Sequence, residues 1–281
     1  MATSPQKTAL VTGCTPGGIG NALARELHSR GFFVFATART LEKITDLKGL
    51  GIECLCLTVD DTESVKACHK KAVQILDGRG LDFLINNAGK TIVRPSIELN
   101  IPEAKDLFAT NILGPMLLTQ TFSPQLLHAK GTIVNIGSVA GHIPLPFNAV
   151  YSATKAALYA YSACMRLELA PFGVHVVYVQ TGNVRTHIMR QGTRLEEGSK
   201  FLAVEDGFLE RQRIAATTGM ETGVFAGRLV GRLVRGGVGD VVWEGESAGW
   251  CWVGGWLEGW LPFSMWKLFF WWGYGMWRLG E

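Results

Sequence analysis

The sequence predicts one α/β domain with a doubly wound parallel sheet, followed by an aromatic C-terminal extension. Across residues 7–244, short apolar runs alternate with segments whose apolar residues recur at helical spacing, which is the pattern of strands joined by crossover helices. A glycine-rich turn joins the first apolar run to the first helical segment, as in sheets that bind a ligand at their carboxyl edge. No linker, low-complexity tract or internal repeat interrupts this stretch. We therefore expect a domain over residues 1–245 and an extension over residues 246–281.

The elements follow one another in a regular order. Predicted strands occupy residues 8–11, 32–37, 53–59, 81–85, 132–136, 174–179 and 240–243. Helical periodicity lies between them, most clearly at residues 21–30, 41–50 and 220–234. Because helices separate successive strands, the strands are expected to run parallel with helices on both faces. At 281 residues and 47% hydrophobic content, the chain can bury a full core.

Charge and cysteine content narrow the class of protein. The net charge of +3 arises from 27 basic and 24 acidic residues mixed along the chain, so no nucleic-acid partner is expected. Six cysteines lie in mostly apolar segments without metal-ligand spacing or disulfide-scaffold density. Cys54 and Cys56 share a strand face, but no second pair completes a tetrahedral metal site. We expect reduced thiols, no metal, no signal peptide in the short polar residues 1–6, and an intracellular, cytoplasmic protein.

The glycine-rich turn predicts a dinucleotide site. Residues 12–20 read Thr-Gly-Cys-Thr-Pro-Gly-Gly-Ile-Gly where the first strand meets the first helix. A pyrophosphate docks at such a place on exposed backbone amides and the helix dipole. Many α/β proteins also turn with glycines, but the position after the first strand favours the dinucleotide. The predicted contacts are Gly13, Thr15, Gly18, Ile19 and Gly20.

The end of the second strand indicates which dinucleotide is bound. A cofactor without a 2′-phosphate favours an acidic residue there, whereas this sequence reads Ala-Thr-Ala-Arg at residues 36–39. The guanidinium of Arg39 suits a phosphate, which predicts NADPH rather than NADH. The alternative is that Arg39 is a solvated residue at a helix entry. Asp60 is placed to accept from the adenine amino group, and the neighbouring Asp61 is a candidate helix cap before Thr62.

Tyr151 and Lys155 form a candidate proton donor. They lie four residues apart in a helical segment and so share one face. Free tyrosine has a pKa near ~10, and a cation held beside it favours the phenolate and lowers that pKa. Such a pair is poised to protonate a carbonyl oxygen during reduction. The alternative is a helix that carries Tyr and Lys at this spacing without a function.

Further motifs give the chain its family resemblance. Asn86-Asn87-Ala88-Gly89 follows the fourth strand, and Asn111, Ser138 and the Tyr151/Lys155 pair come after it. In this order they resemble the short-chain dehydrogenase/reductase family over nearly all of residues 7–244. The resemblance implies a Rossmann-type sheet, and further cofactor contacts at Asn87, Ala88, Gly89, Gly182, Val184 and Thr186.

The resemblance also implies a role for each catalytic candidate. Tyr151 would donate the proton and Ser138 would orient the carbonyl. Lys155 would hold the nicotinamide ribose and lower the pKa of Tyr151, and Asn111 would anchor a water that connects Lys155 to solvent. Taken one at a time, Ser138 could be a turn residue and Asn111 a helix-bend residue. Their order with Tyr151 predicts a site.

Two departures from the family pattern stand out. Four residues separate Gly13 from Gly18 where the family places three, so the phosphate loop is expected to bulge. Thr181-Gly182 stands where the family has Pro-Gly. With these features the chain resembles the fungal NADPH-dependent 1-acyldihydroxyacetone phosphate reductases and related reductases of fungal secondary metabolism.

The substrate is expected to be a lipophilic carbonyl or alcohol compound. Residues 187–217 match the family's mobile lid, whose charges nearly cancel apart from Arg185, Arg190 and Arg194 near its start. The candidate substrate-binding residues are Ser138, His142, Pro144, Phe147, Tyr151 and Arg190. An acyl-dihydroxyacetone phosphate or a secondary-metabolite ketone would be reduced, and the reverse oxidation of an alcohol is the alternative. A catalytically silent lipid-surface protein is the alternative from another class, which the intact motif disfavours.

The C-terminal extension demands a separate explanation. All nine tryptophans lie between Trp243 and Trp277, and the longest uncharged runs, 247–257 and 268–277, have 11 and 10 residues. Neither run reaches the roughly 20 residues needed to span a bilayer. We expect a monotopic anchor on a membrane, such as the endoplasmic reticulum, or on a lipid droplet. The alternative is packing on a partner subunit or over the substrate cleft. The alanine-rich helix after Tyr151 suits a homodimer or homotetramer.

Overall fold

A computed structural model describes residues 6–188, 193–249 and 271–280. Within these residues, the strands form one sheet in the order β3-β2-β1-β4-β5-β6-β7, and every neighbouring pair is parallel. The strands are β1 (Thr8–Val11), β2 (Phe33–Ala38), β3 (Glu53–Cys56), β4 (Phe83–Asn86), β5 (Thr132–Ile136), β6 (His175–Thr181) and β7 (Val241–Glu244). The predicted doubly wound parallel sheet is confirmed.

Helices connect the strands as the periodicity predicts. They are α1 (Ile19–Ser29), α2 (Thr45–Lys48), α3 (Thr62–Leu76), α4 (Ile101–Phe108), α5 (Gly114–Ala129), α6 (Ala149–Leu169), α7 (Glu205–Thr217) and α8 (Thr222–Arg235). The expected helix over residues 41–50 is instead a 3₁₀ turn, Leu41–Ile44, followed by the single turn α2. Asp61 caps α3 as predicted, because its carboxylate accepts from the amides of Glu63 and Ser64 at 2.9 and 3.0 Å.

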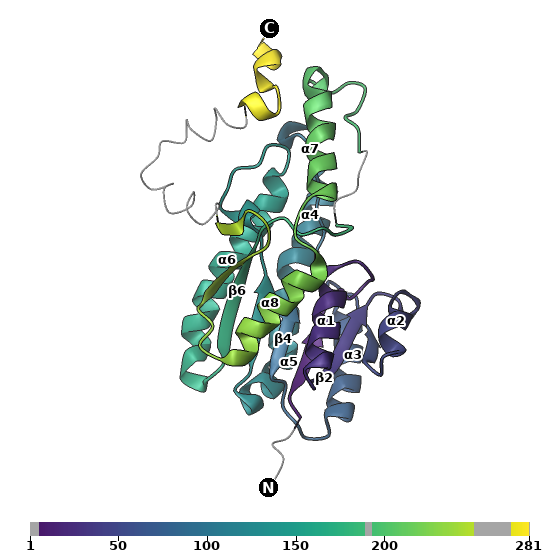
Figure 1. Cartoon of the computed structure of the whole chain (residues 1–281), viewed down its shortest axis with the longest axis vertical. Helices are drawn as coiled ribbons and strands as arrows, with labels where there is room; N and C mark the ends of the chain where they lie inside the picture. Colours follow the sequence, from purple (N-terminus) through teal and green to yellow (C-terminus); the bar gives the residue numbers. More distant parts are fainter. Residues whose placement is uncertain (1–5, 189–192, 250–270, 281) are drawn as a thin grey trace.

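Helices cover both faces of the sheet (Figure 1), and an apolar core lies on each face. One core contains side chains of α1 and α8, including Leu23 and Leu229, and the other contains side chains of α3, α5 and α6. Successive residues of β1 alternate between them, since Val11 belongs to the first core and Leu10 to the second. Burial on both faces explains why the strands read as continuous apolar runs.

The strand order brings the predicted site residues to one edge. β1 lies between β2 and β4, so the chain leaves β1 and β4 in opposite directions across the sheet. The glycine turn follows β1, the Asn87 segment follows β4, and Ser138 follows β5. All three therefore lie at the carboxyl edge, where doubly wound sheets bind ligands.

The lid and the C-terminal residues meet at one end of the molecule. Figure 1 shows α7 and the yellow C-terminal segment at the end opposite the N terminus. Tyr274 is 8% exposed and packs in an apolar cluster with Phe147 and with Phe208 of α7. Tyr274 of the extension therefore packs against the lid helix. Residues 250–270, which hold most of its tryptophans, lie outside the described residues.

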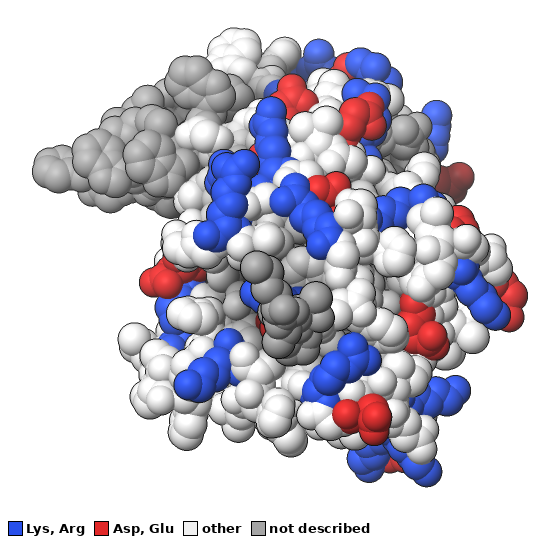
Figure 2. Space-filling view, turned by 60° about the horizontal axis from the view of Figure 1, so that its bottom comes forward, with Lys and Arg blue, Asp and Glu red and all other residues white. Residues whose placement is uncertain are grey.

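Charged residues are interspersed with uncharged ones on the face shown in Figure 2. Several charged residues of the chain pair locally, such as Arg30 with Glu26 at 2.7 Å. No helix among the described residues has both the length and the apolar character needed to cross a membrane.

Candidate active site

The glycine turn absorbs its extra residue in a local β-turn. The Gly18 amide donates to the Thr15 carbonyl at 3.1 Å, with Pro16 at the second position and Gly17 at the third. Gly17 has φ +73°, which a type II turn requires and which glycine adopts without strain. The turn ends at Gly18, and α1 begins at Ile19. The predicted bulge is therefore a compact turn ahead of the helix.

A hydrogen-bonded cradle joins this turn to the segment after β4. Asn87 Nδ2 donates to the carbonyls of Thr12 and Gly13 at 2.7 and 3.2 Å. The Thr12 hydroxyl accepts from the amides of Asn87 and Ala88, both at 2.9 Å. A Cβ on Gly20 would lie 2.5 Å from the Gly13 carbonyl oxygen, so only glycine permits this approach. The Asn87 side chain, predicted to contact the cofactor, is used to hold the turn.

The cradle fits a dinucleotide with a 2′-phosphate. Thr15 and Gly17 are exposed at the start of α1, where backbone amides and the helix dipole favour an anion. Arg39 is exposed directly after β2, so its guanidinium is available to a phosphate. Asp60, after β3, has a side chain 18% exposed. This donor set fits NADP(H).

The predicted catalytic triad is assembled from two elements. Tyr151 and Lys155 lie on α6, and Ser138 caps a 3₁₀ turn after β5, its hydroxyl accepting from the Ala140 amide at 3.1 Å. The Ser138 side chain lies close enough to the Tyr151 phenol to affect its pKa. Lys155 Nζ lies 5.7 Å from the Tyr151 ring centroid and donates to the Ile136 carbonyl at 2.9 Å. The structure therefore brings together the three residues that the sequence singles out.

Burial governs the electrostatics of the triad. It raises the pKa of the Tyr151 phenol above its ordinary value, and the hydrogen bond with Ser138 partly offsets this rise. Burial also lowers the pKa of Lys155 to about 8. The expected lowering of the Tyr151 pKa by Lys155 is therefore not found in the protein alone. The reason is geometric, since the ammonium points to the Ile136 carbonyl and its own charge is destabilised by burial.

Tyr178 fixes Ser138 relative to α6. Its hydroxyl donates to the Lys155 carbonyl at 3.0 Å and accepts from the Ser138 amide at 3.4 Å. A Cβ on Gly137 would lie 2.0 Å from the Tyr178 ring, so a glycine before Ser138 makes room for this contact. Sequence reasoning missed Tyr178, although an aromatic residue in a buried strand opposite a glycine was the available signal.

Asn111 lies in a π-helical turn, Ala109–Leu113, between α4 and α5. Its side chain is 1% exposed and bonds both backbone groups of Lys90: Oδ1 accepts from the amide at 2.9 Å and Nδ2 donates to the carbonyl at 3.0 Å. Nδ2 also donates to the Thr154 hydroxyl, which donates to the Tyr151 carbonyl at 2.7 Å. Asn111 is thus tied to the catalytic helix, and its role as a water anchor stays a prediction.

The residues after β6 approach the cradle in different ways. A Cβ on Gly182 would lie 2.3 Å from the Glu246 carbonyl oxygen, so this glycine permits a close backbone crossing. Val184 is 7% exposed and packs in the core beside α8, which leaves its backbone for any cofactor contact. Thr186 is half-buried. The His187 imidazole lies over Gly17, since a Cβ there would be 2.5 Å from Nε2; the sequence did not predict this contact.

The candidate substrate residues fall into separate environments. The His142 ring packs edge-on against Tyr159 at 4.9 Å and stacks on Trp243 at 6.0 Å between centroids. Phe147 is 6% exposed, has φ +65° and packs against Phe208 of the lid helix at 5.0 Å. Pro144 is partly exposed. Arg190 lies outside the described residues. Their roles in substrate binding stay predictions.

Gln180 is a second residue that the sequence did not reveal. It is fully buried on β6, on the same strand face as Tyr178 and beside Trp243 of β7. Neither its Nε2 nor its Oε1 has a hydrogen-bond partner in the described part of the chain. A buried amide without partners is destabilising, and here it stands one residue before the end of the strand that leads to Gly182.

Comparisons with known proteins identify the family. The family model described as "short chain dehydrogenase" matches residues 7–197. The chain is 44% identical over 193 residues to the NADPH-dependent 1-acyldihydroxyacetone phosphate reductase of Schizosaccharomyces pombe, a match that covers 68% of this chain and 65% of that protein.

Solved structures give the same result. A short-chain dehydrogenase from Streptomyces avermitilis is 29% identical, with a TM-score of 0.81 and coverage of 94% of this chain and 97% of that chain. A short-chain dehydrogenase from Burkholderia cenocepacia in complex with NADP is 27% identical, with a TM-score of 0.70 and coverage of 89% and 92%. The chain belongs to the short-chain dehydrogenase family. It is an NADP-dependent oxidoreductase that acts on the CH–OH/C=O couple, and its cofactor is NADP(H).

Proposed function

We propose that this protein reduces a lipophilic ketone to a secondary alcohol with NADPH, using Tyr151 as the proton donor. The observation that carries the proposal is that Tyr178 holds Ser138 against the helix that carries Tyr151 and Lys155, where the Ser138 side chain acts to lower the pKa of the Tyr151 phenol. These groups lie at the sheet edge that also carries the dinucleotide cradle. A phenol and a hydroxyl that converge on one point suit a carbonyl oxygen.

Each side chain has a separate task in the proposed reaction. Bound NADPH supplies a hydride to the carbonyl carbon. Ser138 donates a hydrogen bond that orients the carbonyl oxygen, and Tyr151 transfers its phenolic proton to that oxygen as negative charge develops there. Protonated Lys155 favours the phenolate that this transfer leaves behind. Tyr178 and Thr154 hold Ser138 and α6 in place through the bonds described above.

The apolar environment beside the site supports a lipophilic substrate. Phe147, Phe208 and Tyr274 join the segment after Ser138, the lid and the C-terminal residues in one cluster. An acyl-dihydroxyacetone phosphate is a candidate because the Schizosaccharomyces relative bears that activity in its name. Two of the cations that could bind a substrate phosphate already have carboxylate partners, however. Arg185 pairs with Glu221, and Arg194 lies 3.7 Å from Glu205. A phosphate-free ketone, as in secondary metabolism, is therefore the second candidate.

A comparison of matched substrates separates the two candidates. Acyl-dihydroxyacetone phosphate and its dephosphorylated form differ only in the phosphate. An unchanged kcat/KM on removal of the phosphate would exclude phosphate recognition, and a large fall would support it.

We also propose that the extension associates with a membrane or lipid-droplet surface. Trp271, Trp272 and Trp277 are 38, 71 and 40% exposed, and tryptophan favours the interface between water and lipid. Replacing Trp272 and Trp277 together by Ser should reduce co-sedimentation of the full chain with liposomes. Unchanged co-sedimentation would contradict this role. The homodimer or homotetramer stays a prediction.

The function is tested by following NADPH oxidation with a panel of ketones. The wild-type protein should turn over lipophilic ketones, and Tyr151→Phe should be nearly inactive although it still binds NADPH. Equal rates in both proteins would defeat the catalytic role of Tyr151. Turnover only with secondary alcohols and NADP⁺ would favour the oxidative direction, and binding without turnover would favour a silent lipid-surface protein.

A further inference from the structure

We propose that Lys90 is a positioning residue that links the adenine end of the cofactor cleft to the catalytic helix. Its ammonium holds the Asp60 carboxylate so that one oxygen is presented to the adenine amino group, while its backbone fixes Asn111. The proposal rests on NADP(H) binding at the cradle, but it does not depend on which ketone is reduced.

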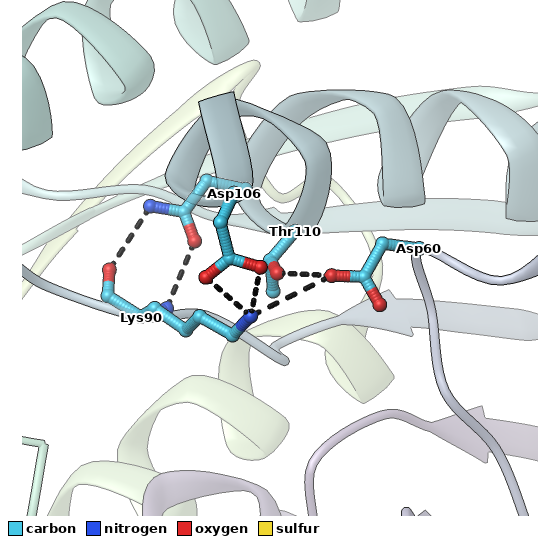
Figure 3. A network of polar contacts seen from close by, with 5 residues as sticks. Asp60, Lys90, Asp106 and Thr110 are labelled. Atoms are coloured by element: carbon cyan, nitrogen blue, oxygen red, sulfur yellow. Dashed lines mark hydrogen bonds and ion pairs between the residues drawn. The ribbon is translucent and has the colours of Figure 1, made fainter. Parts of the chain in front are cut away.

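The side chain of Lys90 lies between two carboxylates (Figure 3). Nζ lies 2.7 and 2.8 Å from the two oxygens of Asp106 and 3.6 Å from Asp60 Oδ2. Asp60 Oδ2 also accepts from the Thr110 hydroxyl. Oδ1, the other oxygen of Asp60, has no side-chain donor among the described residues. The side-chain donors therefore hold the carboxylate through Oδ2, which leaves Oδ1 without a side-chain partner among these residues.

The charge state of Asp60 suits this role. Burial raises the pKa of its carboxyl, but the Thr110 hydrogen bond, a hydrogen bond from the Asp60 backbone and the charge of Lys90 together outweigh burial, and the pKa is lowered. Asp60 is thus an anion at neutral pH and accepts hydrogen bonds only. The amino group of adenine is a donor, so the pair is complementary. The side chain is 18% exposed, which leaves Asp60 accessible from one side.

The backbone of Lys90 reaches the catalytic end. Its amide and carbonyl bond the two ends of the Asn111 amide at 2.9 and 3.0 Å, which fixes that side chain at two points. Thr110 and Asn111 are successive residues of the π-helical turn. One bonds Asp60 and the other continues through Thr154 to the Tyr151 carbonyl. A displacement of Asp60 or of the Tyr151 backbone is therefore expected to move the same π-helical turn.

A simple surface ion pair does not explain this arrangement. Asp106 is 58% exposed, and pairs with such exposed partners contribute little to stability. Asp60 is far less exposed, and two donors from different segments converge on one of its oxygens. The contact of Lys90 with Asp60 therefore carries the proposed role. The test needs variants that show the effect of Asp60 apart from the effect of Asp106.

The experiment measures binding by calorimetry with two ligands. NADP⁺ carries the adenine amino group, and nicotinamide hypoxanthine dinucleotide phosphate has a carbonyl in its place. Lys90→Met should weaken NADP⁺ binding about 10-fold, the scale of one charge-assisted hydrogen bond, and should leave binding of the hypoxanthine analogue within about 2-fold. Thr110→Val removes the other donor to Asp60 and should show the same selective loss.

Three control variants accompany this measurement. Lys90→Arg keeps the cation and should restore NADP⁺ affinity to within about 3-fold of wild type. Asp106→Asn and Lys66→Met each remove an exposed ion pair and should change NADP⁺ affinity by less than about 2-fold. Equal weakening of both ligands by Lys90→Met would show a general structural role and overturn the proposal. Unchanged NADP⁺ affinity would overturn it as well.

Discussion

The two ends of the cofactor cleft balance their charges in opposite ways. At the end proposed to bind adenine, Lys90 lies within 3.6 Å of both Asp60 and Asp106, and all three side chains reach solvent. At the catalytic end, Lys155 is 6% exposed and has no ion pair with any described carboxylate. Within the described part of the chain, its ammonium donates a hydrogen bond only to the Ile136 carbonyl. Lys90 therefore has counter-ions in the protein, whereas Lys155 has none among the described residues.

This difference indicates that the catalytic end lowers the folding stability of the protein in favour of its function. A buried charge without a counter-ion and a buried amide without partners both destabilise the fold, and Lys155 and Gln180 supply one of each. Perturbed groups of this kind gather at functional sites. A bound cofactor and substrate bring polar groups that such residues lack, so the catalytic end is expected to gain more from ligand binding.

Lys155→Met is expected to have the largest effect on the difference between the two ends. Loss of the cation that favours the phenolate should lower kcat/KM by about 10²- to 10⁴-fold, the range for proton-transfer catalysis. Removal of an unpaired buried charge should raise the free energy of unfolding at pH 7 by about 1–3 kcal/mol. Steady-state kinetics and urea unfolding measure the two effects. Lower stability together with unchanged activity would contradict the account.

Arg39→Asp should have the next largest effect, at the other end of the cleft. Loss of charge-assisted bonds to the 2′-phosphate should raise KM for NADPH by about 10- to 100-fold, and the new carboxylate should improve the use of NADH. The measurement is KM for both cofactors with one ketone. Because Arg39 is exposed, the thermal unfolding temperature should not move. An unchanged preference for NADPH would show that Arg39 is only a solvated residue.

The pH dependence of stability should sharpen the contrast. Burial lowers the pKa of Lys155 from 10.5 to about 8, so between those values the unfolded chain binds a proton that the folded protein does not. Folded stability from this group therefore rises with pH across that window and is lost as pH falls through 8. Between pH 7.5 and 9.5, wild type should gain about 2 kcal/mol relative to Lys155→Met. No relative gain in urea unfolding would show that the ammonium is solvated or paired.

Gln180→Leu should give the smallest effect. Replacing an unbonded buried amide by an apolar group of similar shape should stabilise the protein by about 1 kcal/mol. The matched control is Gln74→Leu on the exposed surface of α3, which should stay within about 0.5 kcal/mol of wild type. Thermal unfolding of both variants gives the comparison. Destabilisation by Gln180→Leu would show that the amide is bonded by a buried water.

Periodicity was sufficient for the fold, but not for its details. The strands after the glycine turn were predictable because apolar runs of strand length alternate with helical patterns. The third strand ends at Cys56 rather than at residue 59, since its last apolar residues continue in the core beyond the ladder. The π-helical turn at Asn111 left no compositional mark, because one extra residue in a helical turn changes hydrogen bonding and not residue type.

Some residues of the candidate site could also be predicted from the sequence, and others could not. Tyr151, Lys155 and Ser138 were predictable because each has a fixed spacing or place after a strand. Lys90 and Tyr178 were not, since their partners Asp60 and Ser138 lie 30 and 40 positions away in the sequence. The orientation of the Lys155 ammonium also could not be predicted, because spacing places two side chains on one face without fixing where their charges point.

A single-turnover measurement tests the central claim most directly. Wild type and Tyr151→Phe, each loaded with NADPH to the same measured occupancy, are mixed rapidly with a saturating ketone, and the decay of NADPH absorbance gives the rate of hydride transfer. The account predicts matching NADPH affinities and a transfer rate at least about 100-fold lower in Tyr151→Phe. Equal transfer rates at equal occupancy would show that the proton comes from another group, and would contradict the role assigned to Tyr151.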